Sequence, residues 1–310
     1  MLPGPYPLPL DALLFALLAA LAFAALDLSQ KWSAKYAVGS PRAFLALRLM
    51  AVAVLSPLLL LFPGTRQPQA TPWGPFAGLV LVNLAGNLLY LWSVYRADIS
   101  ALGALWPLKN LYLPLIAFLL PPHERFPPMV YALVLLAAAG ALGIAWNERL
   151  GIRAFCERPL WLMALVTVPL FAVSDTLFGQ VSLAIGGATA TVEMAGAMAL
   201  LAVPALLWPP DARAAVTLSL RSRHGLVGVG MTGLCLVIGI ACIGEAFRRA
   251  GGGVVLVNVF AMLSGVILVG VNALRPGWLE REPGKVYAVR ILGALVLCAS
   301  AVLVLLNRPR

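Results

Sequence analysis

Charged residues are scarce in this sequence. Asp, Glu, Lys and Arg together make up only 11% of its 310 residues, whereas soluble domains contain about 25%. Hydrophobic residues account for 62%, and they gather in runs of about 20 residues, the length that crosses a bilayer as an α-helix. The composition therefore excludes an ordinary soluble protein. The apolar runs predict ten transmembrane helices, at residues 10–30, 43–63, 76–95, 99–120, 129–146, 160–180, 189–208, 226–246, 254–274 and 286–306.

Cysteine and histidine are rare as well, with four and two residues in the whole chain. Cys235, Cys242 and Cys298 fall inside predicted spans, so the cysteine spacing gives neither a disulfide framework nor a metal site. The nucleotide-binding motif Gly-x-x-x-x-Gly-Lys-Ser/Thr is absent too, which argues against ATP as the energy source. We therefore expect no metal and no cofactor.

Period-two alternation is missing from the apolar runs. Residues 132–139 are hydrophobic throughout, whereas the strands of a membrane β-barrel alternate apolar and polar residues. Helices then remain as the way to satisfy backbone hydrogen bonds in lipid. The net charge of +10 comes from basic residues scattered over short loops, which favours anionic lipid headgroups over nucleic acid as partners. The predicted fold class is an all-α integral membrane protein.

Short motifs recur in the same order in the two halves of the chain. Residues 23–27 (Phe-Ala-Ala-Leu-Asp) resemble residues 171–175 (Phe-Ala-Val-Ser-Asp), and Val130-Tyr-Ala opens the fifth span as Val286-Tyr-Ala opens the tenth. A duplicated five-helix unit explains this order. Because five is an odd number, the two units must enter the membrane from opposite sides, as the inverted repeats of secondary transporters do. We expect a first repeat at residues 1–148 and a second at 149–310, joined into one compact membrane unit.

The ten spans and the duplication resemble the drug/metabolite transporter superfamily, in particular its EamA-like family. Lys31 after the first span, Arg48 in the second, Pro107 in the fourth and Glu124-Arg125 before the fifth match the family's pattern. In this chain Glu124 follows Pro-Pro-His where the family usually has Gly, and the second half has no counterpart of Arg48. The resemblance covers essentially the whole chain and implies a transporter.

Lys109 is the only charged residue of the predicted fourth span. A charge at bilayer depth costs roughly 2.5–3.5 kcal/mol on insertion scales, so it normally faces a bundle interior or a watery cavity. At helical spacing Trp106 and Tyr112 share its face, and aromatic rings beside an ammonium suit a substrate pocket. The stretch Trp106-Pro-Leu-Lys109 also resembles the Tyr-Gln-Leu-Lys of nucleotide-sugar transporters, which implies that Lys109 helps to bind an anion. The alternative is that Lys109 pairs with a buried acid and only fastens helices together.

Polar side chains form a stripe along the third span. Asn83, Asn87 and Tyr90 stand at i, i+4 and i+7, on one helical face. Amides that faced lipid would be unpaired, so we expect this stripe to look inward, either lining the substrate cavity or bonding helices together. Asn258 in the ninth span has a related place in the second half and the same two interpretations.

Three acids within the spans are candidates for proton coupling. Asp27 and Asp175 occupy equivalent positions in the two repeats, and Glu193 lies early in the seventh span. A carboxylate at bilayer depth could carry a proton and couple transport to the proton gradient. For Asp27 we favour a pair with Lys31 one turn later, and for Glu193 a structural pair with Arg48 is conceivable. Asp175 has no basic neighbour at that spacing and is the better candidate.

A secondary transporter explains these features best. It would move a small organic metabolite, bearing a carboxylate or phosphate, by alternating access, driven by protons or by exchange. Two alternatives remain, an exporter of hydrophobic or cationic compounds and an intramembrane enzyme acting on lipid-linked intermediates. We expect a multi-pass protein of the plasma membrane (in a bacterium, the inner membrane), as a monomer or homodimer. Loop charges and the family resemblance predict opposite orientations of the termini.

Overall fold

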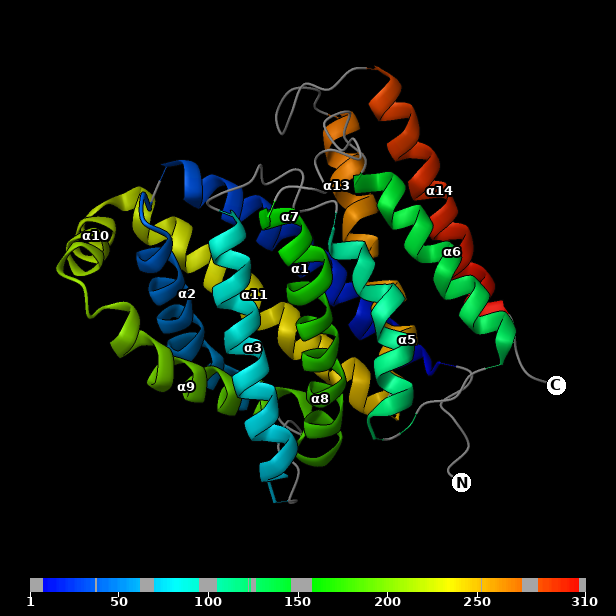
Figure 1. Cartoon of the computed structure of the whole chain (residues 1–310), viewed down its shortest axis with the longest axis horizontal. Coiled ribbons are helices and arrows are strands. Elements are labelled where there is room, and N and C mark those ends of the chain that lie inside the picture. Colours follow the sequence, from blue (N-terminus) through cyan, green and yellow to red (C-terminus); the bar gives the residue numbers. More distant parts are fainter. Residues whose placement is uncertain are drawn as a thin grey trace.

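The computed structural model describes residues 8–36, 38–61, 70–94, 105–121, 123, 127–145, 158–251, 253–274 and 284–306, and these form helices without any strand. Glu124 and Arg125 lie outside the described residues, as does the side chain of Lys31. The helices, shown in Figure 1, are α1 (Leu10–Tyr36), α2 (Pro41–Leu55), α3 (Trp73–Val94), α5 (Lys109–Leu119), α6 (Pro128–Ala145), α7 (Arg158–Leu162), α8 (Val168–Ile185), α9 (Gly187–Leu206), α10 (Pro210–Arg221), α11 (Arg223–Arg249), α12 (Val254–Ala261), α13 (Leu263–Leu274) and α14 (Gly284–Leu306).

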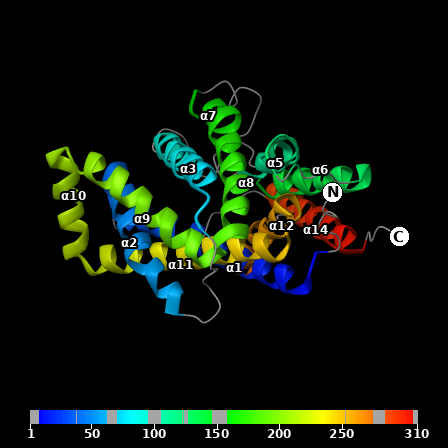
Figure 2. The same cartoon turned by 90° about the horizontal axis from the view of Figure 1, so that it is seen from below.

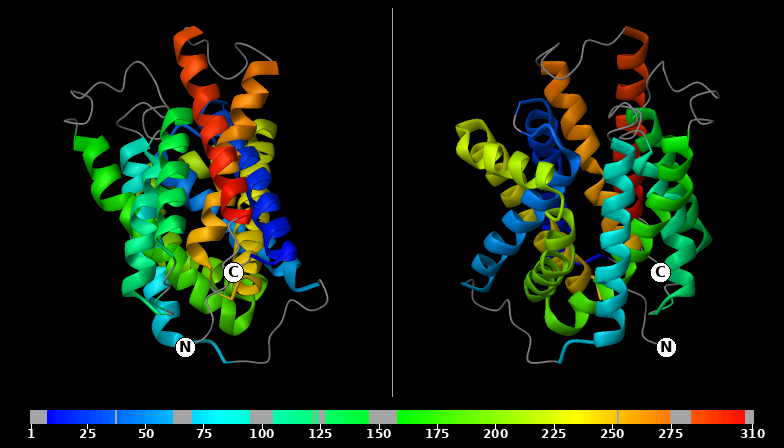
Figure 3. Two further views of the ribbon diagram at one scale, coloured as in Figure 1. Left: turned by 90° about the vertical axis from the view of Figure 1, so that its right-hand side faces the viewer. Right: turned by 60° about the vertical axis from the view of Figure 1, so that its left-hand side comes forward.

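Each of the ten predicted apolar ranges contains a helix. Eight helical stretches among the described residues are long and apolar enough to cross a membrane, and the two remaining ranges hold the shorter apolar helices Lys109–Leu119 and Pro128–Ile144. The all-α class and a multi-pass membrane protein are therefore confirmed. The described chain begins and ends at the same end of the bundle, where α1 starts and α14 finishes (Figure 3).

Several spans are not the continuous α-helices that an apolar run predicts. A 3-10 helix at Ser56–Leu61 extends α2, and another at Trp106–Leu108 precedes α5. The segment Met163–Thr167 is π-helical, with the Val168 N–H donating to the Met163 carbonyl five residues back. Pro169 follows at once and has no N–H to continue the α-helical pattern. Such π-bulges occur often at functional sites.

Helix α10 was not predicted. It buries Ala212, Val216 and Ser219, at i, i+4 and i+7, while charged residues such as Asp211 and Arg213 face outward. This is the pattern of an amphipathic surface helix. Its polar face kept it out of a search for apolar runs. In Figure 1 it lies at one edge of the molecule, where it packs against α11 and α2.

Small residues let α1 pack closely along α11, the most extensive helix pairing in the structure. Ala12, Ala16 and Ala19 are fully buried on one face of α1. On the other face Leu14 and Leu18 are about half exposed, as expected for side chains that meet lipid. A helix with one face of small residues and one of leucine is typical of membrane bundles, where close van der Waals packing replaces the hydrophobic effect.

Helices α6 and α14 lie side by side at the other edge of the molecule (Figure 1). Their contact is glycine to glycine. A Cβ added at Gly140 would lie 2.6 Å from the backbone nitrogen of Leu297, and one added at Gly293 would lie 2.5 Å from the Gly140 carbonyl oxygen. No larger residue fits at this crossing without separating the helices.

Helix α8 occupies the centre of the bundle. It contacts α3, α5, α9, α11 and α12, and seen from below it stands between the α2–α9–α10 group and the α5–α6–α14 group (Figure 2). Residues of α8 can therefore meet side chains from both halves of the chain.

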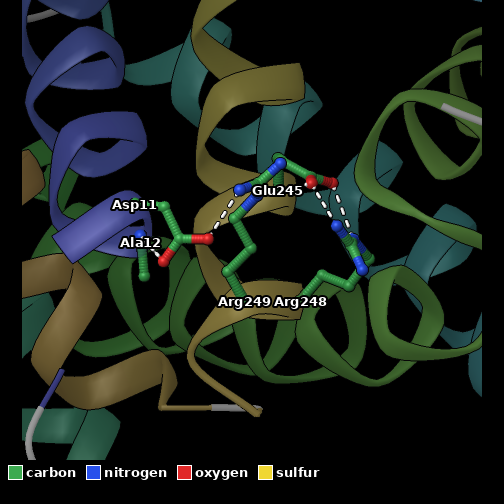
Figure 4. A network of polar contacts seen from close by, with 5 residues as sticks. All are labelled: Asp11, Ala12, Glu245, Arg248 and Arg249. Atoms are coloured by element: carbon green, nitrogen blue, oxygen red, sulfur yellow. Dashed lines mark hydrogen bonds and ion pairs between the residues drawn. The ribbon is translucent and has the colours of Figure 1, made fainter. Parts of the chain in front are cut away.

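A network of four charged residues fastens the start of α1 to the end of α11 (Figure 4). Arg249 bonds Asp11 at 2.6 Å and Glu245 at 2.8 Å, while Arg248 binds the same Glu245 carboxylate at 2.5 Å. The Arg249 guanidinium also lies 4.7 Å from the centre of the Phe15 ring. The network contains two cations and two anions, so its net charge is zero. It stabilises the packing of α1 against α11. The chain then turns at Gly251, whose φ of 63° suits glycine.

Candidate functional site

Lys109 and Asp175 form an ion pair inside the bundle. The Lys109 Nζ lies 2.7 Å from the Asp175 Oδ2, and the two side chains are 17% and 20% exposed. Lys109 is the first residue of α5, directly after the 3-10 turn at Trp106–Leu108. The expectation that it sits within an uninterrupted α-helix was wrong. The turn begins around Pro107, which cannot donate a backbone hydrogen bond, and it presents Lys109 to α8.

The partner of Lys109 is Asp175, the acid predicted from the sequence to be the better candidate for proton coupling. The absence of a basic neighbour within α8 did not leave Asp175 without a cation, because Lys109 reaches it from another helix. The alternative interpretation of Lys109, a pair with a buried acid, is the contact observed. A partly exposed pair can still exchange partners, so the contact is compatible with a role in binding.

Aromatic rings adjoin this ion pair. The centre of the Trp106 ring lies 5.0 Å from that of Phe171, one turn before Asp175 on α8, and 5.3 Å from that of Tyr90 on α3. A Cβ at Gly86 of α3 would lie 3.2 Å from the Phe171 ring, so glycine at this position makes room for that ring. Trp106, Tyr90 and Phe171 thus form an aromatic row between α3 and the 3-10 turn.

Tyr112 belongs to the same region. Together with Tyr90 and Trp106 it packs, partly buried, against an apolar cluster that joins the α5 turn to the start of the sixth span: Leu105, Leu160, Met163, Ala164 and Val168. The three predicted aromatic residues are therefore brought together on one apolar cluster, beside the 3-10 turn that precedes Lys109.

The asparagine stripe of α3 faces the bundle interior, as predicted. The Asn83 amide donates to the Ser174 hydroxyl at 2.9 Å, and the Asn87 amide donates to the Asn83 side-chain oxygen at 2.6 Å. At the far end, the Arg48 guanidinium of α2 donates to the Asn87 side-chain oxygen. Ser174 is next to Asp175 in the chain, so a continuous polar row connects Arg48 to the neighbour of the ion pair.

Arg48 and Glu193 do not pair with each other. The Glu193 carboxylate accepts from the Thr71 hydroxyl at 3.1 Å, and Arg48 bonds the neutral Asn87. The pair considered from the sequence is therefore not formed. Glu193 and Arg48 lie on the adjacent helices α9 and α2, but each faces a different polar group.

Asn258 and Asp27 lie outside the immediate contacts of Lys109. Asn258 is 1% exposed in α12, and its amide donates to the Val254 carbonyl at 2.9 Å. Asp27 is an exposed residue of α1. Among the residues that the structure describes, no group of three or more His, Cys, Asp or Glu side chains is placed to hold a metal ion.

Phe171 and Ser174 were missed as site residues. Both belong to the motif Phe171-Ala-Val-Ser-Asp175. In the sequence this motif was interpreted only as evidence of duplication. A repeated motif inside a membrane span was itself the signal, because three of its five residues touch the site. Arg48 had been assigned only a structural role.

Comparison with known proteins finds one family model and a set of solved structures. Residues 10–146 match the model of the EamA-like transporter family. Among 26 solved chains that match, one crystal structure of a protein shares 20% of its sequence with this chain and has a TM-score of 0.65, covering 96% of this chain and 98% of its own. At that identity the likeness shows the fold alone. No curated protein matches the sequence significantly. The first half of the chain, at residues 10–146, is therefore similar to EamA-like transporters.

Proposed function

We propose that this protein is a secondary active transporter that moves a small organic metabolite, bearing a carboxylate or phosphate, across the plasma membrane by alternating access. The match of residues 10–146 to the EamA-like family model supports a membrane transporter of the drug/metabolite type. The observation that carries the finer proposal is the partly exposed Lys109–Asp175 pair, because it joins a residue of the first half to one of the second in the middle of the bundle.

The helix contacts support two inverted repeats. If the halves are exchanged, so that α1 replaces α8, α3 replaces α11 and α5 replaces α12–α13, the α1–α11 pairing maps onto α3–α8 and the α1–α12 pairing onto α5–α8. Two further pairs, α2–α9 and α6–α14, map onto themselves. Such a pattern is expected of a twofold-related duplication whose substrate site lies between the halves.

One pair of contacts supports the same symmetry at the level of residues. Phe23 and Phe171 open the two matching motifs, and each ring packs on a glycine of the other half. A Cβ at Gly239 of α11 would lie 2.7 Å from the Phe23 ring, just as one at Gly86 would touch Phe171. Repeats at residues 1–148 and 149–310 account for both contacts.

The ion pair suggests how substrate and proton are coupled. A substrate carboxylate or phosphate that takes Lys109 displaces Asp175, which then holds an unpaired charge at bilayer depth. Because an isolated buried charge is expensive, the displaced carboxylate takes up a proton. Substrate binding and protonation thus accompany each other. Trp106 and Tyr112 flank the substrate, and Asn83, Asn87, Tyr90 and Asn258 supply polar contacts.

Exchange in proteoliposomes tests this proposal. Vesicles loaded with one member of a panel of carboxylates, organic phosphates, amino acids or amines are assayed for uptake of the same labelled solute. We expect an anion to exchange. Lys109→Met should abolish the exchange, while Lys285→Met, at an exposed lysine of α14, should not. Exchange of amines alone would favour the exporter of cationic compounds, and exchange of an anion by Lys109→Met would contradict the role of Lys109.

Coupling needs its own measurement. Asp175→Asn should keep exchange at equal concentrations but lose accumulation driven by a pH gradient, because asparagine cannot carry the proton. Asp211→Asn, at an exposed aspartate of α10, is the matched control. If Asp175→Asn still accumulates substrate under a pH gradient, the proton travels elsewhere.

A further inference from the structure

Arg48 is a buried cation whose charge no described acid neutralises by direct contact. Its side chain is 7% exposed. One guanidinium nitrogen donates to the neutral Asn87, and Nε has no hydrogen-bond partner among the described residues. Lys109, by contrast, is held by Asp175. Leaving a buried charge unpaired costs several kcal/mol, so the position of Arg48 requires an anion in some state of the protein.

The acid on the helix adjacent to Arg48 is engaged elsewhere. Glu193 of α9 accepts from Thr71 and does not bond Arg48. The guanidinium donates to the side chain of Asn87, which is neutral. This amide can orient an anion but cannot replace one.

We infer that Arg48 is an anion-binding residue that takes the acidic group of the transported metabolite, a carboxylate or a phosphate, while Asp175 still occupies Lys109. The inference rests on the proposed transport function. Arginine presents its N–H groups as a planar fork that matches a carboxylate or phosphate with two parallel hydrogen bonds. Asn87 accepts from one nitrogen of the fork, and Nε is buried without a hydrogen-bond partner among the described residues.

The polar row indicates the order in which an incoming anion meets the two cations, Arg48 and Lys109. In the state that the structure shows, Lys109 is already neutral with Asp175, so an incoming anion finds its uncompensated positive charge at Arg48. The row of Asn87, Asn83 and Ser174 leads from there to the ion pair. The same acidic group then displaces Asp175 from Lys109, and the displaced carboxylate takes up the proton. Arg48 and Lys109 are thus two positions for one anion.

Ligand-induced stabilisation of the purified full-length protein tests this inference. In a neutral detergent, thermal unfolding is measured against benzoate, phenylphosphonate and the uncharged benzamide. A ligand that binds the folded state raises its stability, so the two anions should stabilise the wild type saturably and benzamide should not. Arg48→Gln should weaken anion binding about 30-fold, the loss expected when one partner of a buried charge pair is removed. Arg213→Gln, at an exposed arginine of α10, should leave it unchanged.

Two further variants separate the two cations. Lys109→Met combined with Asp175→Asn removes the ion pair without leaving a lone charge, and it should retain the anion response. Arg48→Lys keeps the charge but loses the fork, so its affinity should fall between those of wild type and Arg48→Gln. If Arg48→Gln does not fold, Arg48→Lys is tested in its place. An anion affinity of Arg48→Lys equal to that of the wild type overturns the inference.

The other outcomes are equally definite. An anion response that persists in Arg48→Gln but disappears in the double variant places the anion at Lys109 and overturns the role of Arg48. Stabilisation by phosphatidylglycerol, with none by the soluble anions, would mean a lipid site and also overturns it. Exchange in proteoliposomes that does not depend on Arg48 refutes this inference while leaving transport intact. Arg48-dependent binding without exchange of any solute refutes transport instead.

Discussion

Removing one partner of the Lys109–Asp175 pair should destabilise the protein far more than removing both. The two atoms lie 2.7 Å apart, and each side chain keeps about a fifth of its surface exposed. Loss of one partner of a buried pair costs about 3–5 kcal/mol, because the other charge stays behind without compensation. The partial exposure puts this pair at the low end, so we expect Lys109→Met and Asp175→Asn each to lose roughly 3 kcal/mol.

The double variant should recover most of that loss. Methionine and asparagine fill nearly the same space as the original side chains and leave no charge to bury, and replacement of a buried pair by neutral residues is often neutral. We expect it to be within about 1 kcal/mol of the wild type. The measurement is SDS-induced and thermal unfolding of the purified protein in detergent. A double variant as unstable as the sum of the two single variants would refute the pairing.

Two further contrasts test the packing and the second ionic network. Gly140→Leu should destabilise by more than about 3 kcal/mol, because a Cβ there lies 2.6 Å from the Leu297 backbone and overpacking typically costs 1–3 kcal/mol even where side chains can shift. Gly196→Leu, where a Cβ meets nothing within 4 Å, should change stability by less than about 0.5 kcal/mol. Glu245→Gln should cost about 1–2 kcal/mol because it releases two arginines. Asp11→Asn, at an acid 48% exposed, should cost less than about 1 kcal/mol. Thermal unfolding measures the stability of all four variants. Equal losses of stability for the two glycine variants, or for the two acid variants, would contradict the corresponding prediction.

The sequence predicted the helices well because lipid imposes one rule on all of them. An apolar run of sufficient length must form a helix, and each of the ten ranges does contain one. The failures arise where that rule does not apply. Helix α10 is too polar to be recognised as a span, and the 3-10 turn before Lys109 depends on a local proline rather than on hydropathy.

The contacts of the site were only partly predictable. The inward direction of Asn83 and Asn87 followed from the cost of an amide in lipid, and it is confirmed by the bond to Ser174. Which acid meets Lys109 could not follow from the sequence, because Asp175 lies 66 residues away on a helix brought near only by the packing of the two halves. The sequence offered three acids within the spans as possible partners, Asp27, Asp175 and Glu193.

The proposed twofold arrangement does not extend to the chemistry of the site. Asp27 and Asp175 hold matching places in the two proposed repeats, yet α5 carries Lys109 whereas α12 and α13 carry no charged residue. Under the proposed mechanism, Asp175 is the acid that alternates between a lysine, a substrate and a proton. Asp175→Asn should abolish accumulation driven by a pH gradient, and Asp27→Asn, the same substitution in the same motif, should leave it in place. The reverse result in proteoliposomes would move the coupling acid to α1, and loss in both variants would mean that the two repeats share the proton.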